Sequence, residues 1–245
     1  MATRRIGGRL FTLLQVQVVH RHGDRTPISP MVDKQFWRSV IPTVSSLTAL
    51  AEGTVVSRDG DASAPHPAAG DGLFGTLSSR GVEQLHAIGE RLRADHVPSL
   101  LPAHPDATSL RVSSTDFPRT IQSAQALLQG LYPLSTRSDP ITIDVSLHDA
   151  MIPDPVPRTT HKQELLEQSV LNSAAVRSHA AAHEGMRLEY SEKLRGVLDP
   201  AAYTMNGVGA GDEVGAALSW NKIAEVLKCL HSCARGWHSN RTRPK

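Results

Sequence analysis

Apolar and polar residues follow each other along the chain in patterns typical of both strands and helices. Residues 11–20 are rich in leucine and valine, which predicts a buried strand that runs into a turn at residues 22–24. Residues 77–92 repeat apolar side chains on one helical face, and Ser78 or Ser79 can cap the start of that helix. These two segments indicate a protein that mixes strands and helices.

Further strand and helix signals continue this alternation. The expected elements are a short helix over 47–52 capped by Ser45 or Ser46, a strand over 110–112, a helix over 117–131 with cap residues at 113–116, a strand over 141–145, two helical pieces over 163–198 and a last helix over 213–234. Residues 57–71 are expected to form a loop, and the prolines between 153 and 157 an extended segment. Strands that alternate with helices predict an α/β fold.

Composition narrows the classes of partner. At 245 residues with 40% hydrophobic side chains, the chain can bury the core of one large domain, or of a domain with a smaller cap. Lys and Arg number 26 and Asp and Glu 24, so the net charge of +2 gives no field that would attract nucleic acid. Any anion site must therefore be local. Histidine, with 12 residues, is unusually frequent.

The cysteines and the amino-terminal residues do not indicate in which cellular compartment the protein is found. Cys229 and Cys233 are one helical turn apart, where we expect ordinary thiols rather than a disulfide or a metal site. We expect no signal peptide and no integral membrane segment. Arginines without acidic residues before His20 resemble a mitochondrial presequence, so the localisation stays open, as does the oligomeric state.

Residues 21–27 read Arg-His-Gly-Asp-Arg-Thr-Pro and directly follow the first predicted strand. Loops at the carboxyl ends of strands carry the ligand sites of open α/β sheets. Arg21 and Arg25 disfavour the protonated form of His22, which keeps the imidazole neutral and nucleophilic. Guanidinium groups match phosphate oxygens, so these side chains suit attack on a bound phosphoryl group. A basic turn with a solvated histidine is the alternative interpretation.

The same seven residues match the signature Arg-His-Gly-x-Arg-x-Pro of the histidine acid phosphatase family, in branch 2 of the histidine phosphatase superfamily, at every fixed position. Residues 75–93 resemble the helix that follows in that family, and residues 113–124 resemble its second active-site segment. The match departs at Ser113, where relatives often carry an arginine. In detail, these segments look nearest to the lysophosphatidic acid phosphatase branch.

The resemblance implies a fold like that of phosphoglycerate mutase, an α/β three-layer sandwich with a helical cap. Residues 1–150 would form the amino-terminal part of the phosphatase domain, 151–235 the cap and 236–245 a disordered basic tail. The last strands of the family, and the His-Asp pair that follows one of them, are not recognised in this sequence. The resemblance therefore predicts a domain that is truncated on its carboxyl-terminal side.

The resemblance also implies a two-step mechanism. His22 would attack phosphorus to form a phosphohistidine, which water would then hydrolyse. Arg21, Arg25 and a further arginine that falls on Arg119 would bind the phosphate oxygens. The first turn of a helix, where the pattern puts Arg119, also favours an anion. The substrate would be a small phosphomonoester, and no metal or cofactor is implied.

The general acid stays unassigned. In the family, the aspartate of the late His-Asp pair protonates the leaving alcohol, and the one such dipeptide in this chain is His148-Asp149. It comes only 29 residues after Arg119, and the prolines behind it cannot begin the helix that follows the family's pair. We interpret the dipeptide as a coincidence and keep Asp149, with His148, as a candidate only.

Two functions therefore compete. One is phosphomonoester hydrolysis of the acid phosphatase type, through a phosphohistidine. The alternative is a phosphate-binding pseudoenzyme, or a fragment of such a phosphatase, which holds an anion but lacks an effective proton donor. A nucleic-acid module is disfavoured by the nearly balanced charge.

Overall fold

The computed structural model describes residues 3–6, 9–58, 72–97, 99–106, 108–146, 161–199 and 217–239. The chain divides into two compact units. Unit 1 consists of Met1–Thr26 and Gln35–Asp149, and unit 2 of Pro27–Lys34 and Ala150–Lys245. The predicted extended segment at 153–157 lies outside the described residues, as does most of the predicted loop at 57–71.

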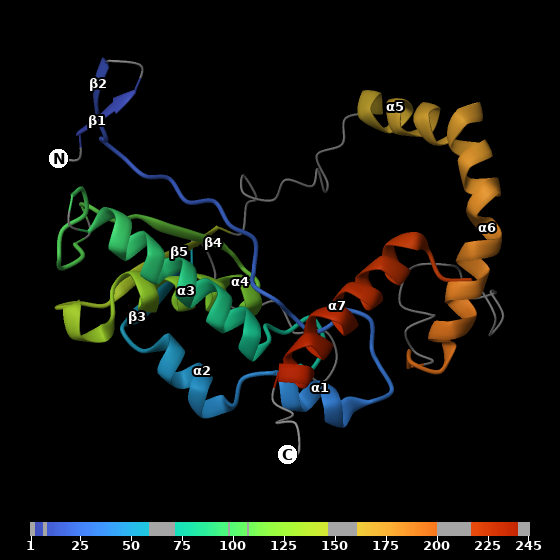
Figure 1. The fold of residues 1–245 in the computed structure, drawn as a ribbon, viewed down its shortest axis with the longest axis horizontal. Coiled ribbons are helices and arrows are strands. Elements are labelled where there is room, and N and C mark those ends of the chain that lie inside the picture. The colour runs from blue at the N-terminus through green and yellow to red at the C-terminus, as the bar shows by residue number, and fades with distance from the viewer. Residues whose placement is uncertain are drawn as a thin grey trace. The chain divides into compact units, whose positions relative to one another are not determined.

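Unit 1 is built on a three-stranded parallel sheet in the order β3-β5-β4 (Figure 1). Its elements are β3 (Thr54–Arg58), β4 (Val112–Thr115), β5 (Ile141–Ser146), α1 (Lys34–Val40, which begins at the last residue of unit 2), α2 (Val44–Ala51), α3 (Ser79–His96), α4 (Pro118–Leu131) and the short 3-10 helix η1 (Leu134–Thr136). An antiparallel hairpin of β1 (Thr3–Ile6) and β2 (Arg9–Thr12) precedes them. The predicted α/β class is confirmed.

The core of unit 1 lies between the sheet and helices α3 and α4. Strand β5 alternates, with Ile141, Ile143 and Val145 buried and Thr142 and Asp144 exposed. Period-two alternation is the pattern of a strand that is covered on one face. The described residues of unit 1 therefore show two layers of the expected sandwich, the sheet and one layer of helices.

Helices α3 and α4 touch through their backbones (Figure 1). A Cβ atom added to Gly89 of α3 would lie 2.0 Å from the carbonyl oxygen of Leu127, and one added to Gly130 of α4 would lie 2.1 Å from the carbonyl oxygen of His86. Neither contact can be relieved by a side-chain rotation because both oxygens belong to the backbone. The two glycines thus set how closely the helices that carry the candidate site can approach.

This contact leads to a prediction about stability. We expect Gly89→Ala to lower the free energy of unfolding by about 1–3 kcal/mol, because the methyl group forces the helices apart. Gly185, in a helix of unit 2, has nothing within 4 Å of an added Cβ, so Gly185→Ala is the matched control and should stabilise its helix by about 0.5–1 kcal/mol. Urea unfolding followed by far-UV circular dichroism measures both. Equal behaviour of the two variants would contradict the packing described here.

The prediction of a buried strand over residues 11–20 is wrong. Strand β2 ends at Thr12, and residues 13–20 belong to no strand. Leu14 and Val19 of this segment are 77% and 96% exposed. A strand requires a hydrogen-bonded neighbour, and in the described part of the chain none pairs with these residues. The apolar pattern therefore shows that these residues could form a strand. Whether they do depends on a neighbouring strand, which the local pattern does not specify.

Element boundaries differ from the sequence prediction at several places. Strand β3 follows the predicted short helix and was missed, and its last two residues, Ser57 and Arg58, lie where the loop was predicted. Helix α2 starts at Val44 and is capped by Thr43, whose hydroxyl accepts a hydrogen bond from the backbone N–H of Ser46, so neither predicted cap is correct. Strand β4 starts at Val112 rather than at 110 and runs through the predicted cap residues. Helix α4 begins with Pro118, whose fixed φ suits the first helical position, and has no side-chain cap.

The other predicted elements of unit 1 are confirmed. Helix α3 starts behind Ser78, which caps it through a hydrogen bond from the N–H of Gly81. Strand β5 matches the strand expected over 141–145, with one more residue at its end. Both segments carry strong periodic patterns, and such patterns are the most informative local signal in a sequence.

Unit 2 contains α5 (His161–Leu171), α6 (Ala174–Arg195) and α7 (Trp220–Ser239). The two helical pieces expected over 163–198 are confirmed. Helix α7 starts at Trp220 rather than at 213 and continues past the predicted end at 234, so residues 236–239 of the expected tail are helical. Cys229 and Cys233 are buried on α7 and form no disulfide.

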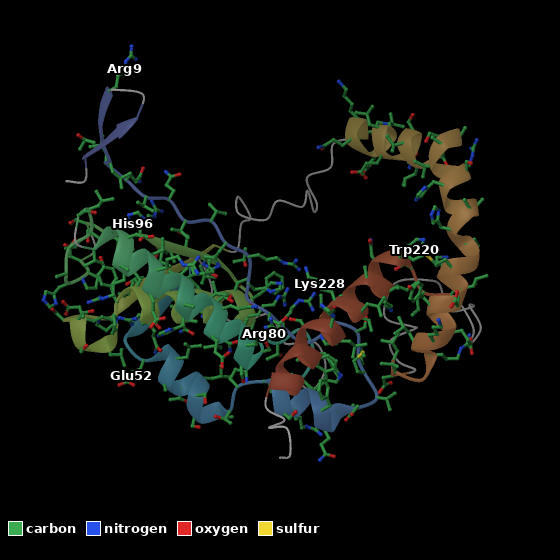
Figure 2. All side chains as sticks on the ribbon, viewed as in Figure 1. Arg9, Glu52, Arg80, His96, Trp220 and Lys228 are labelled. Atoms are coloured by element: carbon green, nitrogen blue, oxygen red, sulfur yellow. The ribbon has the colours of Figure 1, made fainter. Side chains whose placement is uncertain are left out.

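The segment Pro27–Lys34 packs into unit 2. The N–H of Val32 donates to the carbonyl of Val197 at 3.0 Å, and the N–H of Asp199 donates to that of Pro30 at 3.0 Å. Buried side chains of this unit include Met31, Leu198, Leu218, Ile223 and Val226. By contrast, α5 buries no residue. Figure 2 draws the side chains of both units as sticks. None of the described helices combines the length and the apolar character that a membrane crossing requires.

Candidate active site

The loop of residues 21–27 is attached to helices α3 and α4. The N–H of Gly23 donates to the hydroxyl oxygen of Ser123 on α4 at 3.0 Å, and that hydroxyl donates to the carbonyl of Arg119 at 2.7 Å. The N–H of Asp24 donates to the side-chain oxygen of Gln84 on α3 at 2.9 Å. These bonds join segments that are 60 and 100 residues apart in sequence, so the loop is positioned by the tertiary structure.

Asp24 is hydrogen-bonded to Ser78 at the start of α3. The hydroxyl of Ser78 donates to Oδ2 of Asp24 at 2.8 Å, and the backbone N–H of Ser78 donates to the carbonyl of Asp24 at 2.9 Å. The carboxylate of Asp24, two residues after His22, is thereby engaged with the residue that caps α3. This arrangement gives Asp24 a structural role in the loop.

The loop also touches α3 directly. A Cβ added to Gly23 would lie 2.5 Å from the carbonyl oxygen of Gly81, and one added to Gly81 would lie 2.2 Å from that of Asp24. Only glycine at both positions permits this approach without a backbone shift. The signature glycine, Gly23, is therefore required by the packing of the loop on the helix.

The second half of the loop is fixed by Thr26. Its N–H donates to the carbonyl of Thr76 at 2.9 Å, its hydroxyl donates to the carbonyl of Leu73 at 2.8 Å, and the N–H of Thr76 donates back to that hydroxyl at 3.0 Å. Arg25, only 8% exposed, donates from Nη1 to the carbonyl of Thr26 at 2.8 Å. These contacts make Arg25 a buried and positioned cation, whereas Arg21 is exposed.

His22 is half-buried, and one hydrogen bond defines its tautomer. Nδ1 lies 2.8 Å from the carbonyl oxygen of Gly23. A carbonyl only accepts hydrogen bonds, so Nδ1 carries the proton and Nε2 of the neutral ring carries the lone pair. A histidine held in this way presents Nε2 as a nucleophile.

The surroundings of His22 keep its imidazole neutral. Burial is the largest cause that lowers its pKa, to about 4, and the charges of Arg21, Arg25 and Arg119 lower it further, against the hydrogen bond to Gly23, which raises it. The four residues named by the sequence are thus close enough to interact. A neutral imidazole beside three guanidinium groups is a site that favours an anion.

Arg119 is the second residue of α4, and its guanidinium lies 4.4 Å from the ring centre of Phe117. Its Nη1 donates to the carbonyl of Gly75 at 3.4 Å. Its Nε–H is buried and meets no acceptor in the described part of the chain. Burial, followed by the charges of Arg25 and Arg21, lowers the pKa of Arg119. A buried donor among like charges is what an anionic ligand would satisfy.

Several residues of the site were not predicted from the sequence. Ser123 comes one helical turn after Arg119, and this spacing alone could have suggested that it shares a helix face with Arg119. Phe117, Gln84 and the ion pair between Arg58 and Asp116 had no local signal. In that pair Nε of Arg58, at the end of β3, lies 3.1 Å from Oδ1 of Asp116, behind β4.

The candidate acid, Asp149 with its neighbour His148, lies outside the described residues. Among the residues that the structure describes, no cluster of three or more His, Cys, Asp and Glu side chains could hold a metal ion.

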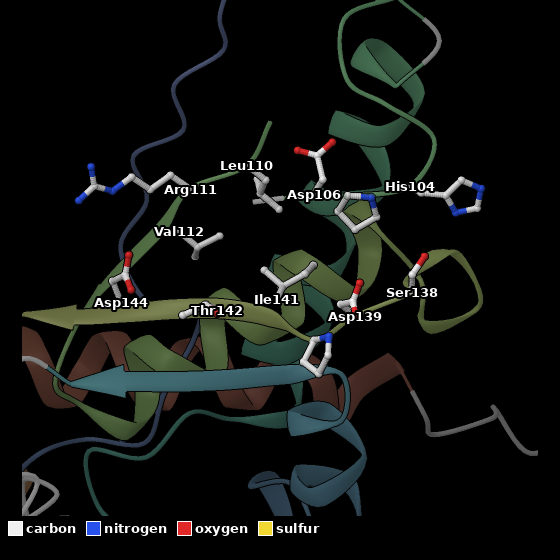
Figure 3. Close-up of a pocket in the computed structure, with 12 residues that line it drawn as sticks. His104, Asp106, Leu110, Arg111, Val112, Ser138, Asp139, Ile141, Thr142 and Asp144 are labelled. Atoms are coloured by element: carbon white, nitrogen blue, oxygen red, sulfur yellow. The ribbon is translucent and has the colours of Figure 1, made fainter. Parts of the chain in front are cut away.

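A cavity of about 790 Å³ lies elsewhere in unit 1, at the amino ends of β4 and β5 (Figure 3). Leu110, Val112 and Ile141 form its apolar part, and Figure 3 shows Asp106 and Asp139 around them. In a parallel sheet the amino and carboxyl ends of the strands lie on opposite sides. The cavity is therefore separate from the site at Arg119, which follows the carboxyl end of β4.

The low pKa of His22 can be measured directly. We expect an NMR titration of its imidazole in the ligand-free protein to have a midpoint near pH 4, so that the ring is neutral at every pH well above that value. Arg119→Ala should move the midpoint upwards, because a repelling charge is removed. A midpoint close to the ordinary histidine value of about 6.5, unchanged in the variant, would contradict the burial and the charge cluster.

Comparisons with known proteins agree with the motif. The family described as "Histidine phosphatase superfamily (branch 2)" matches residues 12–189. Lysophosphatidic acid phosphatase type 6 of Bos taurus is 36% identical over an alignment of 137 residues, which covers 50% of this chain and 32% of the relative. Testicular acid phosphatase of Mus musculus is 29% identical over 228 residues, 89% of this chain and 43% of the relative.

A solved structure of a phytase from Klebsiella sp. ASR1 aligns with a TM-score of 0.34 and 17% identity, over 87% of this chain and 56% of that chain. The curated relatives are matched over about a third to two fifths of their own length. The family match covers most of the length of this chain. The chain belongs to the histidine phosphatase superfamily, branch 2.

Proposed function

We propose that this chain hydrolyses phosphomonoesters through a phosphohistidine at Nε2 of His22. The observation that carries the proposal is the combination at one residue of a fixed tautomer, a pKa lowered to about 4 and three neighbouring guanidinium groups. The neutral ring supplies the electron pair, and the guanidinium groups compensate the charge of the phosphate. Membership of the superfamily supports the same reaction.

The reaction would run in two displacements at phosphorus. In the first, the lone pair of Nε2 forms a bond to phosphorus, and the bond from phosphorus to the ester oxygen breaks with its electron pair on the leaving oxygen. In the second, water attacks phosphorus, the N–P bond breaks, and inorganic phosphate is released. Arg25 and Arg119 would hold the phosphate oxygens in both steps, with Arg21 at the exposed side.

Substrates with different leaving groups can distinguish the proposed hydrolysis from phosphate binding alone. A nitrophenolate leaves without protonation, whereas an alkoxide needs an acid, and general acid catalysis is worth about 10²- to 10⁴-fold. We propose Asp149, beside His148, as the residue to test for that role. The names of the bovine relative and of its mammalian counterparts refer to a lysophospholipid monoester, so an alkyl phosphate of this kind is the relevant slow substrate.

The test compares phosphate release from p-nitrophenyl phosphate and from an alkyl phosphate at mildly acidic pH. We expect the nitrophenyl ester to turn over in the 245-residue chain. If Asp149→Asn slows only the alkyl ester, Asp149 is the acid; if it slows neither, that assignment fails. Phosphate binding without release from either ester would contradict the hydrolase and leave the pseudoenzyme as the function.

A further inference from the structure

Two of the many histidines of the chain form a pair on α6 that the phosphatase site does not use. His179 and His183 are one helical turn apart, their ring centres are 4.1 Å apart, and the ring planes are inclined by 35°. His179 is exposed and His183 is half-exposed. Residues four apart on a helix lie on the same face, so the two imidazoles are held side by side by the helix itself.

A hydrogen bond prepares one ring of this pair for a ligand. Nδ1 of His183 lies 2.8 Å from the carbonyl oxygen of His179. Because the carbonyl accepts, Nδ1 carries the proton and Nε2 carries the lone pair. Histidines that bind metals almost always donate their other ring N–H in this manner, often to a backbone carbonyl.

One ion can bridge the two rings if the side chains turn their Nε2 atoms toward each other. Two zinc–nitrogen bonds of about 2.0–2.1 Å at a tetrahedral angle place the nitrogens roughly 3.3 Å apart and the ring centres roughly 5 Å apart. The ring centres lie 4.1 Å apart, so binding requires the two side chains to rotate and their ring centres to separate by about 1 Å. We infer that His179 and His183 bind a divalent transition metal ion such as Zn²⁺ through their Nε2 atoms, with water in the remaining positions.

The neighbouring charges permit this site. The side chain of Arg187 is one turn beyond His183, but it is paired with both carboxylate oxygens of Glu184, at 2.8 and 2.6 Å. Its repulsion of a cation is therefore largely compensated. With no third ligand from the described residues, the ion is exchangeable. Imidazole ligands select transition metals over Mg²⁺ and Ca²⁺, which prefer oxygen.

The inference is tested by calorimetric titration of the 245-residue chain with ZnCl₂, and with MgCl₂ for comparison. We expect one Zn²⁺ to bind and Mg²⁺ not to bind. His183→Ala should weaken Zn²⁺ binding at least about tenfold, because one of two ligands is lost. An unchanged affinity in His183→Ala, or no Zn²⁺ binding by the wild type, would overturn the inference.

The control keeps the number of histidines and changes only their spacing. The double variant His179→Ala/Ala181→His leaves two imidazoles on α6, two residues apart, where side chains do not face each other. We expect it to bind Zn²⁺ as weakly as His183→Ala, while far-UV circular dichroism shows an intact helix content. Wild-type affinity in this variant would assign the ion to other residues of the chain.

Discussion

Replacement of His22 by alanine is expected to reduce the turnover of p-nitrophenyl phosphate by at least about 10⁴-fold, because the nucleophile of a covalent mechanism cannot be replaced by water at its position. Nε2 of His22 is the atom that the hydrogen bond from Nδ1 to Gly23 leaves free for attack. The rates of phosphate release by the wild type and the variant at mildly acidic pH measure the effect.

The control for this variant is another histidine of unit 1. His86 lies on α3 and pairs loosely with Glu90, with 3.7 Å between their nearest atoms. We expect His86→Ala to retain the wild-type rate. If His22→Ala retained that rate as well, the assignment of the nucleophile would be wrong, and the interpretation of residues 21–27 as a catalytic loop would fail with it.

Arg119→Ala is expected to lower kcat/KM by about 10²- to 10³-fold. Loss of one pre-positioned donor to a developing negative charge typically has this effect. Arg119 is partly desolvated, its Nε–H has no acceptor in the described residues, and its pKa is lowered by burial and by Arg25 and Arg21. Removal of such a group deletes both the charge and a donor that the protein leaves for a ligand.

Two further variants separate the charge of Arg119 from its position. Phe117→Leu removes the ring over which the guanidinium lies, at 4.4 Å, and should raise KM about 2- to 30-fold, the range of a cation–π contact of 0.5–2 kcal/mol. Arg91→Ala, at an exposed arginine of α3, should leave the kinetics unchanged. Equal kinetics of Arg119→Ala and Arg91→Ala would contradict the role of Arg119.

The site also shows why an anion would be favoured beside His22. Arg25 is buried, Arg119 is partly buried, and the charges of both lower the pKa of His22. The neutral ring adds no further positive charge to this cluster. Like charges held close together in a desolvated site are stabilised when an anion binds among them. The same cluster therefore accounts for both the neutral imidazole and the binding of a phosphate ester that we propose.

Long periodic segments could be predicted from the sequence. Helix α3 has apolar residues on one face and a serine at its cap, and β5 alternates, so each carries its own signal. The loop of residues 21–27 could be recognised as a candidate site because its residue types suit phosphate binding. Arg119 was placed by resemblance, and its interaction with His22 supports that placement.

The remaining parts depend on contacts between distant segments. Residues 13–20 have the composition of a strand, but no described strand pairs with them. Strand β3 has only five residues, in which polar and apolar side chains do not alternate, and its parallel pairing with β5 is what makes it a strand. Ser123 supports Gly23 across 100 residues. Such pairings follow from the fold and leave no pattern in the local sequence.

The most direct measurement is to trap the phosphorylated protein. The chain is mixed with p-nitrophenyl phosphate that carries ³²P, stopped in alkali within one turnover, and digested for mass spectrometry. We expect the label on His22 in the peptide of residues 21–27, stable in alkali and lost in acid, as an N–P bond requires. Release of phosphate with no label on His22, or with the label on another residue, would contradict the account.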